Sequence, residues 1–357
     1  MVKSWQPEKS QRFHNQHEAF TQKAFDSDHL LPDRYVFVLT NLCNLKCRFC
    51  FQEKDLRENR MRLNDWINIS NQLPEYSRVT FTGGEPLMFD KFNEIIKSVA
   101  QRFDCNMISN GLLLNEKVIE LLLSFPRFKV LSISVDDIGN SVRDVDEKQW
   151  DRTENMMRRF VEKRNEIKSN CVLETKTVVL EKNAEDLFDI YQYCIEELCC
   201  DHHSFQFLKG SPIQHADFMF QFNDMFNKSY APVYNNWDVI IEQLEKVRKY
   251  NIRTGKKSFL HPNVGSLTSN KPISDIRYLN ESEFIKENYH ACKFPWSSVH
   301  INVDGDLFPC MAIQMGNVKK TPLKEIMWGK TFINFKEIIR NEGTVEGCNR
   351  CGWLRPK

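Results

Sequence analysis

Short apolar runs alternate with amphipathic helical stretches between residue 33 and about residue 210. A short apolar run bounded by turn residues is typical of a buried strand, and the stretches between the runs have the period of helices with one apolar face. The alternation predicts β/α units built on a parallel sheet. The predicted strands are 35–39, 78–82, 106–109, 129–135, 173–179 and 204–208.

The remaining residues form three parts of different composition. Residues 1–32 are polar and helical in tendency, and we expect His14 and His17, which have no cysteine partners nearby, to be solvated. Residues 211–287 are rich in aromatic residues and methionine, and form either a packing surface or a lid. Residues 288–357 contain their own cysteines and are predicted to be a separate small module. The predicted domains are therefore 1–32, 33–210, 211–287 and 288–357.

The composition of the chain limits which binding partners and which cellular compartment we expect for the protein. The chain has 49 basic and 48 acidic residues, and a net charge of +1 offers no general attraction for nucleic acid or an anionic membrane. A membrane-spanning stretch and a secretion signal are both absent, so we expect a cytoplasmic protein. Most of the 12 cysteines lie in metal-ligand spacings, which indicates clusters in a reducing compartment and predicts sensitivity to oxygen.

Three cysteines follow the first predicted strand in the spacing C-x3-C-x2-C: Cys43, Cys47 and Cys50. Three thiolates on one tight loop can hold three irons of a [4Fe-4S] cluster and leave the fourth iron without a protein ligand. A zinc loop would want a fourth Cys or His nearby, and a disulfide would not need three thiols at this spacing. The loop therefore favours an iron-sulfur cluster with one open iron.

The loop resembles the cluster motif of the radical S-adenosylmethionine (SAM) superfamily. The resemblance implies a partial (β/α)6 TIM-like barrel, since six strands are too few for a closed barrel of eight, with catalytic groups at the C-terminal ends of the strands. It also implies that SAM binds the open iron and is cleaved by one electron to a 5'-deoxyadenosyl radical that abstracts hydrogen. A reductant such as flavodoxin or ferredoxin would supply the electron.

A Gly-Gly-Glu-Pro segment, residues 83–86, ends the second predicted strand. Such a segment alone could be an ordinary turn, but its place after the second strand matches the family's motif that binds the SAM amino group. The resemblance assigns this role to Gly83, Gly84, Glu85 and Pro86, where the glycines allow close approach and the carboxylate adds charge. Phe49 matches the aromatic residue that packs on adenine, although loop packing would also explain it.

Weaker matches follow the next three strands. Ser109 and Asn110 resemble the family's turn after strand 3, and Ser134 and Asp136 resemble its strand 4, where contacts to ribose or carboxylate occur. Lys176 lies where many members place a polar cofactor contact. A strand end with a helix N-cap would also explain Ser134 and Asp136, and a structural ion pair would explain Lys176.

The C-terminal module has four further cysteines in the pattern C-x17-C and C-x2-C: Cys292, Cys310, Cys348 and Cys351. Four thiolates indicate a fully ligated site, for which structural zinc is a serious alternative. The segment resembles the Twitch module, a small α+β relative of the SPASM extension, which implies one auxiliary [4Fe-4S] cluster. Residues 300–307 are predicted to form a hairpin with an Asp-Gly turn.

The other five cysteines bear on the reaction: Cys105, Cys171, Cys194, Cys199 and Cys200. We expect them to precede strands or lie in a helix, away from the catalytic strand ends, and to be buried packing residues. A reaction that returns no hydrogen atom is therefore favoured. The leading hypothesis is oxidation of a small polar substrate, such as a sugar or aminocyclitol, with the auxiliary cluster as electron acceptor and an unidentified base.

Two alternatives remain open. Radical modification of a ribosomal peptide is one, although the 42 residues before Cys43 are too few for the winged-helix recognition domain that many peptide maturases carry. A non-catalytic iron-sulfur electron carrier is the other. An open cluster next to a Gly-Gly-Glu segment argues against a carrier, which needs neither.

Overall fold

The computed structural model describes most of the chain. The described residues are 7–27, 29–50, 60–208, 234–261, 265–273, 286–310, 313–345, 348, 351–355 and 357. Side chains are described from residue 16 onward. Much of the aromatic-rich segment that was predicted as a lid or packing surface, residues 209–233 and 274–285, lies outside the described residues.

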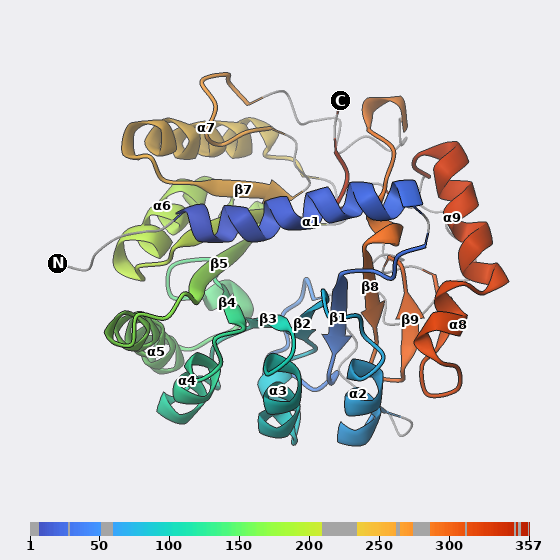
Figure 1. Cartoon of the computed structure of the whole chain (residues 1–357). Coiled ribbons are helices and arrows are strands. Elements are labelled where there is room, and N and C mark those ends of the chain that lie inside the picture. Colours follow the sequence, from blue (N-terminus) through green and yellow to red (C-terminus); the bar gives the residue numbers. More distant parts are fainter. Residues whose placement is uncertain are drawn as a thin grey trace.

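All six predicted strands are present as parallel neighbours in one sheet, which confirms the partial barrel (Figure 1). Helices on the outside of the sheet connect them. The strands are β1 (Arg34–Val38), β2 (Arg78–Thr82), β3 (Asp104–Ser109), β4 (Phe128–Ser134), β5 (Val172–Val179) and β6 (His202–Phe207). The helices are α2 (Leu63–Ser70), α3 (Phe92–Ala100), α4 (Glu116–Leu123), α5 (Glu147–Glu166) and α6 (Leu187–Gln192).

Alternate residues of each strand face the helices, which explains the apolar runs. The rings of Phe37 on β1 and Trp66 on α2 lie 4.9 Å apart, and Phe81 on β2 meets Phe92 on α3 at 6.2 Å. Phe37 is fully buried, and burying such a ring stabilises a fold by about 2 kcal/mol. The other alternate residues face the inside of the barrel, so polar residues there do not disturb this core.

Two further strands extend the sheet in parallel at its two sides. The strand β7 (Ser258–His261) pairs with β6, and β8 (Ser298–Ile301) pairs with β1. The first strand of the predicted C-terminal module is thus part of the barrel sheet. The expected hairpin is confirmed, because β8 pairs antiparallel with β9 (Asp306–Phe308) across Gly305, which has a φ of +88°. A short edge strand, β10 (Gly316–Asn317), completes the ten-stranded sheet.

Three more helices cover the outside of the added strands (Figure 1). The helix α7 (Trp237–Thr254) packs against α6 through a buried face that includes Ile240 and Leu244. The helices α8 (Leu323–Met327) and α9 (Lys330–Glu342) follow the hairpin. None of the described helices is long and apolar enough to span a bilayer.

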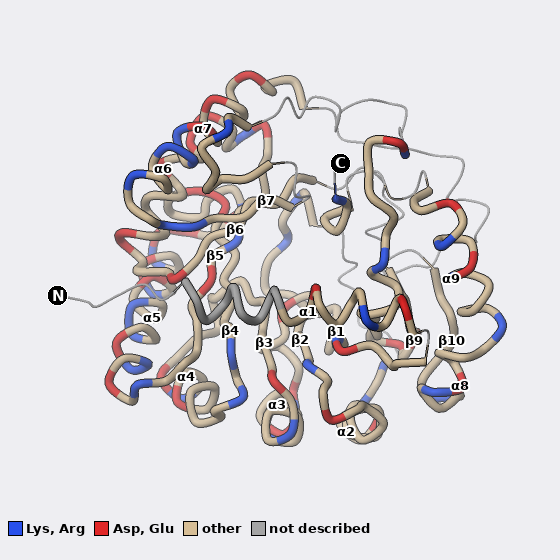
Figure 2. The backbone as a smooth tube through the Cα atoms, turned by 45° about the horizontal axis from the view of Figure 1, so that its top comes forward, with Lys and Arg blue, Asp and Glu red and all other residues tan. Residues whose placement is uncertain are grey.

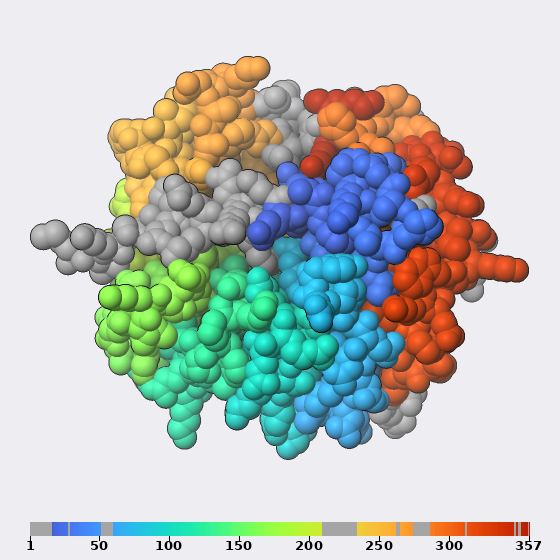
Figure 3. All heavy atoms as spheres, in the orientation of Figure 1, coloured from blue at the N-terminus to red at the C-terminus, as the bar shows by residue number. Residues whose placement is uncertain are grey.

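The N-terminal helix α1 (Pro7–Ser27) lies between the barrel helices and the C-terminal residues (Figure 3). The expectation that His17 is solvated is wrong. Its ring is buried, and Nδ1 lies 3.0 Å from an Asp33 carboxylate oxygen at the start of β1. Burial lowers the pKa of His17 to about 4, so its imidazole is neutral at pH 7. The helix docks on the barrel through this face, which its polar sequence does not reveal; the side chain of His14 lies outside the described residues.

Basic and acidic residues are interleaved along the outer helices (Figure 2). On α5, for example, Arg159 Nε lies 2.8 Å from Glu116 of α4, and Lys163 pairs with Glu120. Interleaved charges of this kind are typical of a solvated helix surface. They agree with the near-zero net charge of the chain.

Candidate active site

The cysteine loop leaves the C-terminal end of β1, at the catalytic end of the barrel. Cys43 is half-buried, Cys47 is buried and Cys50 is exposed, and a turn closed by the Cys50 N–H on the Cys47 carbonyl at 3.1 Å brings the last two together. Among the described residues, no three potential ligands converge on a point suited to a single metal ion. A [4Fe-4S] cluster instead takes each thiolate on a different iron, which suits three thiols spread along one loop.

The Gly-Gly-Glu segment clamps the cysteine loop. The Gly84 N–H donates to the Thr40 carbonyl at 2.7 Å, and the Glu85 N–H donates to the Leu42 carbonyl at 2.8 Å. A Cβ on Gly83 would lie 2.5 Å from the Thr40 oxygen, and one on Gly84 would lie 2.4 Å from the Leu42 oxygen. Only glycine fits this approach of two backbones, so the glycines have a structural reason besides any contact with SAM.

Glu85 is fully buried, and its hydrogen bonds link the end of β2 to the end of β3. Its carboxylate accepts hydrogen bonds from the Ser109 hydroxyl and the Asn110 N–H, both at 2.8 Å, and from the Leu87 N–H at 3.3 Å. The structure therefore brings together three residues that the sequence pattern selected separately. Burial raises the pKa of Glu85 to about 7, against the opposing effect of these donors. Contact between Glu85 and the SAM amino group stays a prediction.

This raised pKa predicts how stability depends on pH. The folded protein binds the Glu85 proton more tightly than the unfolded chain, so the stabilisation is full below about pH 4.5 and is lost as pH rises through about 7. The loss is on the order of 3 kcal/mol at most. Urea unfolding of the metal-free protein across this range should show a weaker pH dependence for Glu85→Gln than for the wild type. Equal dependence in the two proteins would contradict the assignment.

Neutral donors surround Cys43. Its sulfur accepts from the Leu45 N–H at 3.4 Å and lies 3.8 Å from Asn110 Nδ2, which also donates to Asn44 at 2.7 Å. Asn110 thus contacts the cysteine loop directly, whereas the resemblance gave only its place after strand 3. Hydrogen bonds to cluster sulfurs help to set the potential of the cluster.

Asp136 is fully buried, and both of its carboxylate oxygens face protein partners. One oxygen accepts from the Val178 N–H at 2.7 Å, and the other lies 2.7 Å from Arg143 Nε in an ion pair. Burial raises the pKa of Asp136, and Arg143 opposes this rise. Ser134 is half-buried at the end of β4, and its carbonyl accepts from Asn140 at 3.1 Å. Direct contact of Ser134 or Asp136 with SAM stays a prediction.

Lys176 lies on the inner face of the barrel. Its Nζ is 3.4 Å from a carboxylate oxygen of Glu174, which also accepts a hydrogen bond from the Ser132 hydroxyl. Strand register places Ser204, Gln206 and His261 on the same face of β6 and β7. We call this set of six residues the polar floor: Ser132, Glu174, Lys176, Ser204, Gln206 and His261. Contact of Lys176 with SAM stays a prediction.

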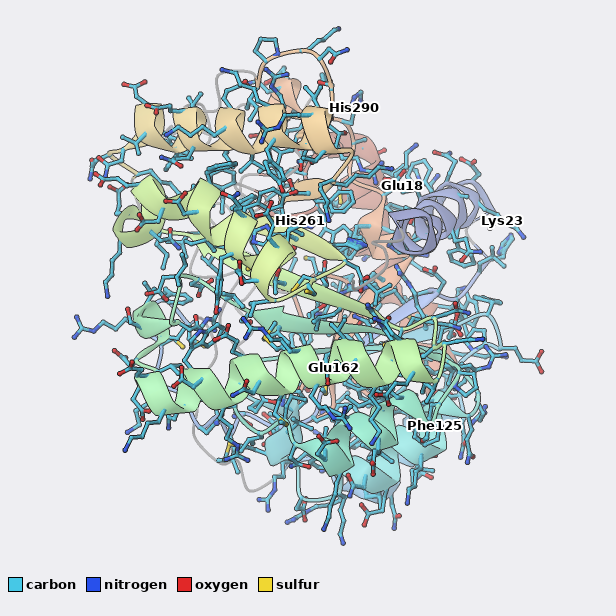
Figure 4. All side chains as sticks on the ribbon, turned by 90° about the vertical axis from the view of Figure 1, so that its left-hand side faces the viewer. Glu18, Lys23, Phe125, Glu162, His261 and His290 are labelled. Atoms are coloured by element: carbon cyan, nitrogen blue, oxygen red, sulfur yellow. The ribbon has the colours of Figure 1, made fainter. Side chains whose placement is uncertain are left out.

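His261 connects the polar floor to the C-terminal cysteines. It ends β7 and is labelled in Figure 4, and its Cβ lies 3.6 Å from the position of a Cβ built on Gly352, the residue after Cys351. Burial and, secondarily, Lys176 lower the pKa of His261 to about 4, so the ring is neutral at pH 7. The sequence alone did not indicate this residue.

The four C-terminal cysteines lie on three segments of the chain, at Cys292, at Cys310 and at Cys348 and Cys351. The Cys292 N–H donates to the Gly343 carbonyl at 2.8 Å, and the Cys351 N–H donates to the Cys348 carbonyl at 2.9 Å. Burial raises the pKa of the Cys292 thiol to about 12, and the neighbouring thiols of Cys351 and Cys310 add to the rise. Neighbouring thiols of this kind fit a site in which a bound metal would hold them as thiolates.

Two family models match the chain. Residues 37–193 match the radical SAM superfamily, and residues 292–352 match SPASM, an iron-sulfur cluster-binding domain. The chain is a radical SAM protein. Its radical SAM domain implies SAM and a [4Fe-4S] cluster, and its SPASM domain implies an auxiliary iron-sulfur centre in place of zinc. That Cys43, Cys47 and Cys50 hold the first cluster stays a prediction. The matched part of this domain contains four cysteines, as a SPASM- or Twitch-type iron-sulfur domain requires.

Relatives of this radical SAM protein act in different settings. The chain is 27% identical over 193 residues to the sporulation killing factor maturation protein SkfB of Bacillus subtilis. This alignment covers 50% of this chain and 45% of SkfB. It is 35% identical over 106 residues to an S-adenosylmethionine-dependent nucleotide dehydratase of Selenomonas ruminantium. This alignment covers 28% of this chain and 38% of the dehydratase. The chain thus spans less than half the length of these relatives.

A solved structure has the same fold. Streptococcus suis SuiB bound to S-adenosylmethionine superimposes with a TM-score of 0.62 at 16% identity, covering 91% of this chain and 72% of SuiB. An identity this low shows the fold alone.

Proposed function

We propose that this radical SAM enzyme abstracts hydrogen from a carbon atom of a small polar substrate and oxidises that substrate. The polar floor carries the proposal. Lys176, Glu174 and His261 offer an ammonium, a carboxylate and a neutral imidazole on the inner face of the barrel. Such groups bind and orient hydroxyl or amino groups, and they would be costly to bury without polar partners.

When bound, the two clusters would supply the redox chemistry: one electron for the cleavage of SAM to methionine and a 5'-deoxyadenosyl radical, and an acceptor for the electron that the substrate radical loses. A one-electron donor such as flavodoxin or ferredoxin would provide the first electron. The protein's own residues hold the reactants. The Gly84 and Glu85 N–H groups fix the cysteine loop, and the neutral His261 and the carboxylate of Glu174 can accept the substrate's hydroxyl proton.

The positions of the five remaining cysteines support oxidation over epimerisation. Cys105 is buried within β3 rather than before it, Cys171 and Cys200 are buried before β5 and β6, and Cys194 is buried in the helix after α6. Burial raises the pKa of Cys194 to about 12. Cys199 is half-buried beside Cys200. These positions are away from the C-terminal strand ends, where a thiol would have to lie to return a hydrogen atom.

Modification of a peptide is the second candidate. SkfB, which matches half of this chain, is named as a maturation protein, whereas the nucleotide dehydratase matches a shorter part. A peptide side chain with a hydroxyl or amino group could also reach the polar floor. The two candidates differ in the substrate and not in the first radical step.

Deuterium transfer can find the substrate. The source cells would be grown on a deuterated carbon source, and their small-molecule and peptide fractions would be incubated separately with the reduced enzyme and SAM. We expect deuterium in 5'-deoxyadenosine with the small-molecule fraction. Transfer from the peptide fraction alone would overturn the small-substrate proposal in favour of peptide modification.

The variant Cys292→Ala tests the role of the auxiliary cluster, assayed with whichever cell fraction transfers deuterium to 5'-deoxyadenosine. It should lose product formation but retain 5'-deoxyadenosine formation, because the substrate radical then lacks its electron acceptor. Cys199→Ala, at a half-buried cysteine outside the clusters, is the matched control and should keep both activities. Product formation by Cys292→Ala at the wild-type rate, or solvent deuterium at the oxidised carbon, would contradict the proposed oxidation.

A further inference from the structure

The Arg143 side chain connects a buried carboxylate to the first cluster loop. Arg143 lies in the turn between β4 and α5, 93 residues beyond Cys50 by their numbering. Its Nη1 points to Cys47 Sγ at 3.9 Å, and its Cζ lies 5.3 Å from the centre of the Phe49 ring. No sequence motif selected Arg143. Neither the comparisons nor the proposed substrate assigns it a role.

The turn that carries Arg143 is held firmly from both sides. Asn140 is fully buried, donates to the Ser134 carbonyl at 3.1 Å and accepts from the Asp136 N–H at 3.0 Å. Asn140 and Asp144, which flank the turn, have φ angles of +55° and +60°, a conformation that non-glycine residues adopt only when their surroundings hold them there. The backbone of Arg143 is therefore fixed relative to β4.

Asp136 fixes the side chain in turn. One carboxylate oxygen is held by the Val178 N–H, and the other pairs with Arg143 Nε at 2.7 Å. Because the pair uses Nε, the terminal nitrogens of the guanidinium remain on the side that faces Cys47. The ion pair thus forms a dipole whose positive end lies beside the cluster loop.

We propose that Arg143, oriented by Asp136, is a positioning residue that raises the reduction potential of the radical SAM cluster. Reduction adds a negative charge to a cluster held by three thiolates, and a cation beside one ligand sulfur stabilises the reduced form. The sulfur of Cys43 receives the neutral donors Leu45 and Asn110 instead. Cleavage of SAM needs a reduced cluster, and a higher reduction potential makes this cluster easier to reduce. The interaction with Arg143 therefore promotes the first step of the reaction.

The test is a redox titration of the two-cluster holoenzyme without SAM, followed by electron paramagnetic resonance. For Arg143→Met, we expect the ratio of reduced to oxidised radical SAM cluster at a fixed potential to fall about tenfold, a shift of about 59 mV for one electron. The auxiliary cluster serves as an internal reference and should not shift. Arg143→Lys keeps the charge and should keep most of the wild-type potential.

The matched control is Arg159→Met, which removes an arginine from an ion pair on the surface of α5 and should leave both potentials unchanged. If Arg143→Met fails to assemble its cluster, Arg143→Gln replaces it, with the same expected result. Wild-type potentials in the neutral variants would overturn the proposal. A shift in Arg143→Lys as large as in Arg143→Met would overturn it too, because the charge would then not be the cause.

Discussion

Replacing Cys43, Cys47 and Cys50 together by alanine should abolish SAM cleavage and remove about half of the bound iron. We expect the three thiols to be the ligands of the radical SAM cluster, and the C-terminal domain keeps its own four cysteines. Iron and sulfide analysis of the anaerobically reconstituted protein, with assay of 5'-deoxyadenosine, measures both effects. The wild type should contain about eight irons and the variant about four.

The control for this variant is Cys199→Ala, which removes a half-buried thiol outside both cysteine sets. It should keep the full iron content and the cleavage activity. A triple variant that still cleaves SAM would show that another site performs the chemistry. A triple variant without any iron would show instead that the auxiliary domain depends on the first cluster for its assembly.

Gly84→Val should have the second largest effect. Its Cβ would lie 2.4 Å from the Leu42 carbonyl oxygen and 2.6 Å from that of Asn41, and both are backbone atoms of the cysteine loop. Because neither strand end nor loop can move without breaking the Gly84 hydrogen bond to Thr40, we expect a loss of about 3 kcal/mol or more of stability. The radical SAM cluster should be lost with it.

Thermal unfolding and iron analysis check this prediction, with Gly265→Ala as the matched control. The nearest neighbour of a Cβ on Gly265 would be Ile273 Cγ2 at 3.5 Å, an ordinary contact distance, so that variant should fold and bind its iron as the wild type does. A Gly84→Val protein with wild-type stability and two clusters would mean that the close approach of loop and strand is not essential.

The barrel could be predicted from the sequence because short apolar runs alternate regularly with amphipathic helical stretches, and large apolar residues of the runs pack against the helices. Phe37 and Phe81 are examples of this local pattern. The strand β7 has no such signal, since it is four residues long and follows two lysines. It is a strand because it pairs with β6, an interaction between segments that are distant in the sequence.

The expected cluster ligands stand out in the sequence because their spacing along the chain is itself the chemical requirement. The polar groups around them do not, because their roles come from distant partners. Arg143 meets Cys47 across 96 residues, and His261 meets the segment after Cys351. The buried hydrogen bond of His17 likewise depends on Asp33, 16 residues away. A sequence pattern shows such residues as isolated charges, whereas the fold gives each one its partner.

Formation of 5'-deoxyadenosine by the reduced wild-type protein tests the central claim most directly. The reconstituted enzyme would be incubated anaerobically with dithionite and SAM, and 5'-deoxyadenosine and methionine would be measured by mass spectrometry. Equal amounts of the two products, formed by the wild type and not by the triple cysteine variant, are predicted. Intact SAM after incubation with a protein that holds both reduced clusters would contradict the account.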